Sequence, residues 1–99
     1  MKMQVRITGP RVHGVGYRLY LLDLAMGYGI DRFSVQRCLY EEEQAVIAWI
    51  EGDDDQLRGF TKEVDKKGPK EAEVTGVAYE PFEGYVSPIM ATAWTLISR

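Results

Sequence analysis

A glycine-rich turn between a strand pattern and a helix pattern is the feature that most constrains the fold of this chain. Residues 3–8 alternate apolar and polar side chains, which predicts a strand with one buried face. Residues 17–28 carry apolar side chains at helical spacing, and glycines at the end of this run supply a stop. Gly14 and Gly16 lie between the two patterns, so the sequence predicts a tight strand-to-helix connection.

The middle of the chain predicts a hairpin and a second helix. Residues 32–40 and 44–51 are rich in β-branched and aromatic types, and residues 41–43, all glutamates, fit a charged hairpin tip between them. Asp53 is the predicted N-cap of the next helix. That helix ends near Gly68, after lysines placed at the negative end of the helix dipole.

The end of the chain predicts two closing strands, at residues 73–79 and 92–98, around a loop that contains prolines and a glycine. The element order is then βαββαβ with one final strand. Two helices can cover one face of such a sheet, and the hairpin makes the sheet mainly antiparallel. We therefore expect a ferredoxin-like α/β (α+β) sandwich with both helices on one face, as a single domain over residues 1–99.

Composition narrows the classes of partner. The net charge of -3 and the pI near 5.1 argue against a nucleic-acid or membrane-surface binder, which needs a broad positive face. No stretch approaches the apolar length of a membrane span or a signal peptide. Cys38, the single cysteine, can form no intrachain disulfide and has no metal-binding pattern near it. These features predict a cytoplasmic protein without a metal site.

The glycine turn has the composition of an anion site. Successive backbone N–H groups in such a turn can point at one spot, and the N-terminus of the following helix adds unpaired N–H groups and a positive dipole end. Arg18, in the first helical turn, would add a guanidinium that binds two phosphate oxygens. From spacing alone, a purely structural turn with a solvated Arg18 remains an alternative.

Residues 11–18, RVHGVGYR, followed by Ala25 and Gly29, resemble the acylphosphatase signature. The usual form of that signature is G-R-V-Q-G-V-G-F-R, with alanine and glycine at the same spacings. His13 stands here in place of the glutamine and Tyr17 in place of the phenylalanine. The resemblance continues through the hairpin and the second helix and covers nearly the whole chain.

The resemblance implies a small cytoplasmic enzyme that hydrolyses the carboxyl–phosphate bond of acyl phosphates without a metal or organic cofactor. Its partners would be a small-molecule acyl phosphate or inorganic phosphate, with no nucleic acid and no membrane, and we expect a monomer. Arg18 matches the phosphate-binding arginine of the family. The matching phosphate cradle comprises Val12, His13, Gly14, Val15, Gly16 and Tyr17.

One family residue is missing. The family places an asparagine that orients the attacking water eighteen residues after the arginine, and this position is Gln36 here, in a chain without asparagine. Glutamine carries the same amide on a longer stem with one more rotor. A displacement of about 1 Å in the amide can cost on the order of 10²-fold in rate. The sequence is therefore compatible with weak activity, with activity restored by local shifts of the structure, or with no activity.

Other conspicuous side chains have structural interpretations. His13 has no acid spaced to orient it, so a position packed in the loop or facing solvent is favoured over a general base. Cys38 fits a structural thiol, and Trp49 and Trp94 fit packing on strands. The run Asp53 to Asp55 fits a helix start better than a metal cluster.

Three functions are compatible with these patterns. The first is an acylphosphatase that uses Arg18 and Gln36. The second is an anion-binding or regulatory module of the same fold that is catalytically weak or inactive. The third, an RNA-binding domain, would need exposed aromatic residues on the sheet face, and the positions of Phe33, Tyr40 and Trp49 test it.

Overall fold

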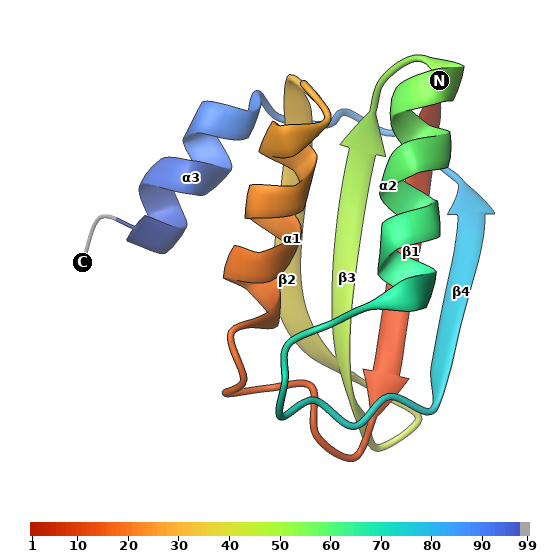
Figure 1. The fold of residues 1–99 in the computed structure, drawn as a ribbon, viewed down its shortest axis with the longest axis vertical. Helices are drawn as coiled ribbons and strands as arrows, with labels where there is room; N and C mark the ends of the chain where they lie inside the picture. Colours follow the sequence, from red (N-terminus) through yellow and green to blue (C-terminus); the bar gives the residue numbers. More distant parts are fainter. Residues whose placement is uncertain (98–99) are drawn as a thin grey trace.

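The computed structural model describes residues 1–97 as one antiparallel sheet covered by two helices, with a third helix at its edge (Figure 1). The sheet has four strands in the order β2-β3-β1-β4, and every pairing is antiparallel. The elements in chain order are β1 (Lys2–Gly9), α1 (Tyr17–Gly27), β2 (Arg32–Tyr40), β3 (Glu43–Glu51), α2 (Asp54–Lys66), β4 (Gly76–Pro81) and α3 (Ile89–Ile97).

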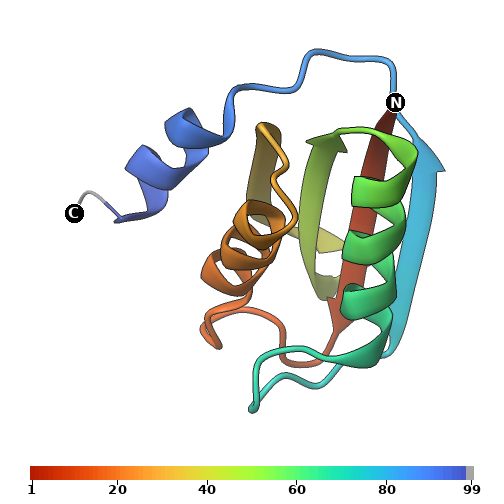
Figure 2. The same cartoon turned by 45° about the horizontal axis from the view of Figure 1, so that its top comes forward.

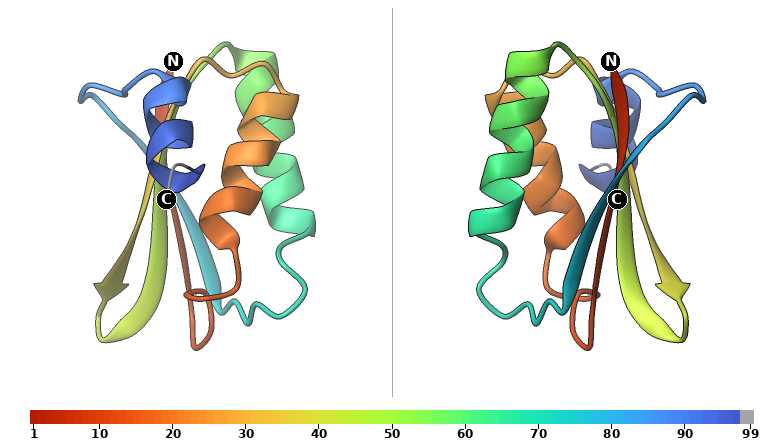
Figure 3. Two further views of the ribbon diagram at one scale, coloured as in Figure 1. Left: turned by 90° about the vertical axis from the view of Figure 1, so that its left-hand side faces the viewer. Right: turned by 90° about the vertical axis from the view of Figure 1, so that its right-hand side faces the viewer.

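The core lies between the sheet and the pair α1 and α2, which cover the same face (Figure 3). Alternate residues of the strands enter it, because successive side chains of a strand point to opposite faces. The predicted alternation of β1 is confirmed, since Val5 and Ile7 are fully buried. Fully buried partners across the layers include Leu21, Ala25, Phe33, Val46, Ala48, Ile50 and Phe60. The ferredoxin-like α+β fold expected from the sequence is confirmed.

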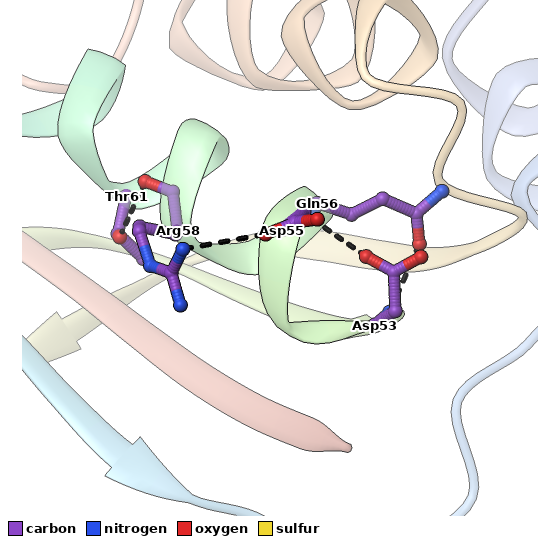
Figure 4. Close-up of polar contacts among 5 residues, drawn as sticks. All are labelled: Asp53, Asp55, Gln56, Arg58 and Thr61. Carbon is purple, nitrogen blue, oxygen red and sulfur yellow. Dashed lines mark hydrogen bonds and ion pairs between the residues drawn. The ribbon is translucent and has the colours of Figure 1, made fainter.

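Helix α2 begins as its sequence predicts. The Asp53 carboxylate accepts a hydrogen bond from the Gln56 N–H at 2.8 Å, and the Gln56 side chain accepts one from the Asp53 N–H at 3.0 Å (Figure 4). This reciprocal pair is a capping box, and it satisfies two N–H groups at the start of the helix. Asp54 and Asp55 then place negative charge at the positive end of the helix dipole.

The hairpin between β2 and β3 closes in a tight turn at Glu41 and Glu42. Both residues have positive φ, 52° and 69°, and Tyr40 pairs directly with Glu43. Two successive positive φ values match the twist of a two-residue hairpin turn. The acidic run therefore lies at the hairpin tip, with Glu43 already part of β3.

The final strand expected at residues 92–98 is wrong where the structure describes it, since Ile89–Ile97 is helix α3, and Ser98 lies outside the described residues. Threonine, tryptophan and isoleucine favour strands, but Thr92, Ala93 and Leu96 turn toward the protein while Met90 and Trp94 are exposed. Spacings of three and four residues are helical. The preceding strand also begins later than expected, at Gly76, and runs to Pro81.

Helix α3 lies along the free edge of β2, beside α1 (Figure 3). The connection from β4 crosses one end of the sheet to reach it (Figure 2). The Phe33 N–H donates to the Ser87 carbonyl at 3.0 Å, and the Ile89 N–H donates to the Asp31 carbonyl at 2.7 Å. The buried Thr92 hydroxyl donates to the Phe33 carbonyl at 2.6 Å. These bonds cover part of an edge that would otherwise expose unpaired backbone groups.

Candidate functional site

The loop between β1 and α1 alternates its backbone conformation at the glycines. Gly14 has φ of 70° and Gly16 has φ of 82°, both in the left-handed region that glycine adopts without strain. Nothing lies within 4 Å of a Cβ added at either position, so backbone conformation rather than crowding requires the glycines. A backbone of this kind turns consecutive N–H groups toward a common point.

The first half of the loop is fastened to β3. The Gln44 side-chain oxygen accepts hydrogen bonds from the N–H groups of Val12 and His13, both at 2.9 Å. The His13 ring Nε2 donates to the Ala45 carbonyl at 2.8 Å. His13 is therefore packed in the loop, as favoured from the sequence, and the two N–H groups that Gln44 binds are already paired.

In the second half of the loop, the backbone N–H groups are unpaired within residues 1–97. Among the described residues, no acceptor pairs with the N–H groups of Gly14, Val15, Gly16 or Tyr17, and the first helical bond runs from the Tyr20 N–H to the Gly16 carbonyl. Helix α1 has Gly16 as its N-cap, without a side-chain cap and without an acidic residue in its first turn. These N–H groups and the helix dipole form a site suited to an oxyanion.

A cavity of about 420 Å³ opens beside this half of the loop. Two guanidinium-bearing side chains border it, Arg18 from α1 and Arg37 from β2. Sequence reasoning predicted Arg18 and missed Arg37; the signal was its place two residues beyond Val35 on the helix-facing side of β2. The full lining is Val12, Gly14, Gly16, Tyr17, Arg18, Leu19, Arg37, Thr95 and Leu96.

Gln36 lines a second cavity, of about 350 Å³, at the edge of β2. Arg18, Thr95 and Leu96 border both cavities, so the two are neighbours. Gln36 and Arg37 are consecutive in the strand, and their side chains therefore leave opposite faces of the sheet. Gln36 and Arg18 thus line the same second cavity, but Gln36 does not line the cavity beside the glycine loop.

Tyr17 and Val15 support the loop from the protein side. Tyr17 is buried and packs edge-to-face on Tyr20 with 6.0 Å between ring centroids, and Val15 packs against the core. Burial, with a smaller contribution from Tyr20, raises the pKa of the Tyr17 hydroxyl above its usual value. Tyr17 therefore stays neutral and adds no negative charge beside the cradle.

The other conspicuous side chains lie away from these two cavities. Phe33 is buried in the core, while Tyr40 and Trp49 belong to the opposite face of the sheet, by the alternation of their strands. There the Trp49 indole donates to Gln4 at 2.9 Å, and the Arg6 guanidinium stacks 3.9 Å above the Tyr40 ring. That face thus carries aromatic residues engaged with neighbouring side chains. Trp94, expected on a strand, lies on α3.

Residues 1–97 contain no group of three metal-ligating side chains close enough to hold an ion. Within the same range, no helix is long and apolar enough to cross a membrane. Cys38, half-buried on β2, is a free thiol.

Comparison with known proteins identifies relatives over most of the chain. A family model described as Acylphosphatase matches residues 3–86. A protein named acylphosphatase from Mesorhizobium japonicum is 33% identical over 86 residues, which cover 87% of this chain and 85% of that protein. Another from Thermotoga maritima is 34% identical over 85 residues, which cover 84% and 88% of the two chains.

Solved structures agree on the fold. The crystal structure of acylphosphatase from Bacillus subtilis superposes with a TM-score of 0.62 at 21% identity, covering 86% of this chain and 89% of that one. Full-length HypF in its phosphate- and nucleotide-bound form gives a TM-score of 0.73 at 20% identity, covering 84% of this chain and 10% of that one. The range matched by the family model ends before α3 begins.

Proposed function

Since the chain belongs to the acylphosphatase family, with the family model matching residues 3–86, we propose that it hydrolyses the carboxyl–phosphate bond of small acyl phosphates. The observation that carries the proposal is the cavity in which Gly14, Gly16, Tyr17 and Arg18 meet at the start of α1. Unpaired backbone donors, a helix N-terminus and a guanidinium are the groups that stabilise a transferring phosphoryl group.

The phosphate end of the substrate would lie against the N–H groups of residues 14–17, with the Arg18 guanidinium binding two of its oxygens. The paired N–H groups of Val12 and His13 would hold the loop in shape through Gln44 rather than bind the anion. Phosphoryl transfer needs positioning and charge stabilisation more than covalent chemistry. A metal or organic cofactor is therefore not part of the proposal.

Gln36 would orient the attacking water from the second cavity. Its amide oxygen accepts a hydrogen bond from the water, whose oxygen attacks phosphorus in line with the leaving carboxylate. A carboxylic acid has a pKa of about 4, so the leaving group needs no general acid at neutral pH. We place this enzyme in the cytoplasm as a monomer, with inorganic phosphate as its second product.

A second candidate is an anion-binding or regulatory module with weak hydrolysis or none. Two observations favour it over full activity: Gln36 has a longer side chain than the family asparagine, and it lies in the cavity next to the loop cavity rather than inside it. A phosphate held in the cradle would then meet no well-placed water.

Hydrolysis of benzoyl phosphate separates the two candidates. We expect turnover by the parent chain, competitive inhibition by inorganic phosphate, and a loss of kcat/KM of about 10² to 10³-fold in Arg18→Ala. Arg58→Ala, which removes an exposed arginine of α2 paired only with Asp55, is the matched control and should keep full activity. Absence of turnover in the parent, with phosphate binding that depends on Arg18, would favour the binding module.

Gln36→Asn tests the water-orienting role directly. If the longer side chain limits the reaction, the substitution raises kcat while the affinity for inorganic phosphate stays unchanged. Gln36→Leu removes the amide at similar volume and should lower kcat by at least tenfold. Equal activity in all three chains would refute a role for Gln36.

A further inference from the structure

Arg37 is a second cationic side chain of the loop cavity, in addition to Arg18. The pairing of β2 with β3 places it opposite Val46, on the side of the sheet where Phe33 and Val35 face the helices. Val46 and Phe33 are fully buried, but Arg37 lies where that side of the sheet opens to solvent next to the glycine loop. The strand thus holds its guanidinium at the rim of the cavity.

The Arg37 guanidinium has no role in holding the fold together. It forms no hydrogen bond, ion pair or ring contact with any residue from 1 to 97. By contrast, the Arg32 guanidinium on the same strand donates to the Val86 carbonyl at 2.9 Å. The lining of the loop cavity includes no acidic side chain among the residues described. A cationic rim of this kind attracts an anion.

The cavity is larger than a phosphate ion. Its volume is about 420 Å³, whereas a tetrahedral anion fills the space of a few water molecules at about 30 Å³ each. Room therefore remains for a second part of the ligand beyond the groups that would hold phosphate. Leu19 and Leu96 line that space with apolar surface, which suits the carbon skeleton of an acyl group.

The in-line geometry of phosphoryl transfer indicates which cavity would hold the water and which would hold the acyl group. In-line displacement requires water and leaving group on opposite sides of phosphorus. In the proposed function Gln36 would hold the water in the second cavity, and Arg18 borders both cavities, so the acyl group would lie on the far side of the phosphate. That side is the remainder of the loop cavity, where Arg37 lies.

We propose that Arg37 binds the carboxylate leaving group, an inference that rests on the proposed function. As the bond from the water oxygen to phosphorus forms, the bond from phosphorus to the acyl oxygen breaks and its electron pair goes to that oxygen. The water loses one proton to the phosphate or solvent, and the products are a carboxylate and inorganic phosphate. A guanidinium pairs with a carboxylate through two parallel N–H bonds, so Arg37 stabilises charge that develops only as the bond breaks.

Product binding provides a test that does not require turnover. We would titrate the parent, Arg37→Gln and Arg37→Lys with benzoate and, separately, with inorganic phosphate by calorimetry. Arg37→Gln should weaken benzoate by at least tenfold and phosphate by less than threefold, and Arg37→Lys should restore part of the benzoate affinity. Arg58→Gln controls for the loss of one positive charge from the surface. Unchanged benzoate binding, or equal losses for both anions, would overturn the assignment.

Kinetics add a readout specific to the leaving group. Across benzoyl phosphates with ring substituents that vary the pKa of the released acid, Arg37→Gln should lose most kcat on the poorest leaving groups. A uniform decrease across the series would overturn the role. Lack of turnover in the parent would instead refute the proposed function, while selective loss of benzoate binding would still locate the carboxylate at Arg37.

Discussion

The two sheet-covering helices begin in opposite ways. Helix α2 starts at Asp53 with a complete capping box and two further acidic residues, so its first N–H groups and its dipole are satisfied within the chain. Helix α1 starts at Gly16 without a side-chain cap and carries Arg18 in its first turn. Arg18 thus adds positive charge at the positive end of its helix dipole, whereas the two acidic residues of α2 add negative charge at the corresponding end of theirs. One helix start is completed within the chain, and the other leaves the N–H groups of residues 14–17 unpaired among the residues that the structure describes.

The same contrast extends along the two helices. At the far end of α2, the Tyr79 hydroxyl of β4 donates to Asp65 at 2.6 Å. At its start the Gln56 side chain donates to the Gly29 carbonyl at 2.9 Å, so α2 is bonded to other segments at both ends. Beside α1 lie instead the loop cavity and the second cavity, with α3 as a further wall. Both cavities thus lie on the α1 side of the sandwich, and none of the described residues of α2 lines either of them.

Of the changes that test the difference between the two helices, a negative charge at the start of α1 should have the largest effect, and the effect should be on phosphate affinity. Gly16→Asp and Gly16→Asn both place a residue that tolerates the left-handed region, and they differ only in charge. The aspartate repels an oxyanion a few ångströms away by about 1 to 4 kcal/mol. We expect inorganic phosphate to bind Gly16→Asp at least tenfold more weakly than Gly16→Asn in a calorimetric titration. Equal affinities would show that the anion binds elsewhere.

Removal of the cap of α2 should have an intermediate effect, and on stability alone. Asp53→Ala loses the capping box and should reduce the free energy of unfolding by about 1 kcal/mol, measured by urea denaturation. Its kcat on benzoyl phosphate should not change. Asp54→Ala, which keeps the cap, is the control and should cost less. A loss of activity without a loss of stability would contradict the division between the two helices.

The smallest expected effect is that of Tyr79 on the free energy of unfolding at alkaline pH. Burial, and next the hydrogen bond to Asp65, raise the pKa of Tyr79 above its usual value of about 10. Above pH 10 the unfolded chain releases the tyrosine proton while the folded chain retains it. The free energy of unfolding should therefore fall with rising pH in that window and be unaffected below it.

Tyr79→Phe should be less stable than the parent at pH 8, because the bond to Asp65 is lost. Its stability should then fall less steeply between pH 10 and 11.5 in urea denaturation. Tyr85→Phe, at an exposed tyrosine, is the control and should follow the parent. Parallel curves for all three chains would exclude Tyr79 as a contributor to alkaline unfolding.

Much of this architecture could be predicted because its signals are local. Alternation in residues 3–8 predicted β1, and Asp53 predicted the start of α2, since each pattern reflects a contact within a few residues. The final strand was wrong because the residues at 92–97 have side chains that suit either state. Burial against the β2 edge, with Thr92 bonded to Phe33, selects the helix.

The candidate site also has features that could be predicted from local sequence and features that could not. The glycine turn and Arg18 could be recognised within one short segment, whereas Gln44 lies 32 residues from Val12 and still decides which loop N–H groups remain available. Arg37 was missed because an arginine on a strand usually faces solvent, although its place two residues beyond Val35 puts it on the helix-facing side of β2.

By itself, the sequence determined the order of the elements up to β4, the buried face of β1 and the glycine turn before α1, because all of these follow from the stereochemistry of neighbouring residues. Only the tertiary structure decided that residues 89–97 form a helix along β2, that Gln36 and Arg37 lie in different cavities, and that both cavities meet at Arg18. These features depend on strand register and on contacts between distant segments, and the free energy of such contacts is not encoded in any single stretch of the chain.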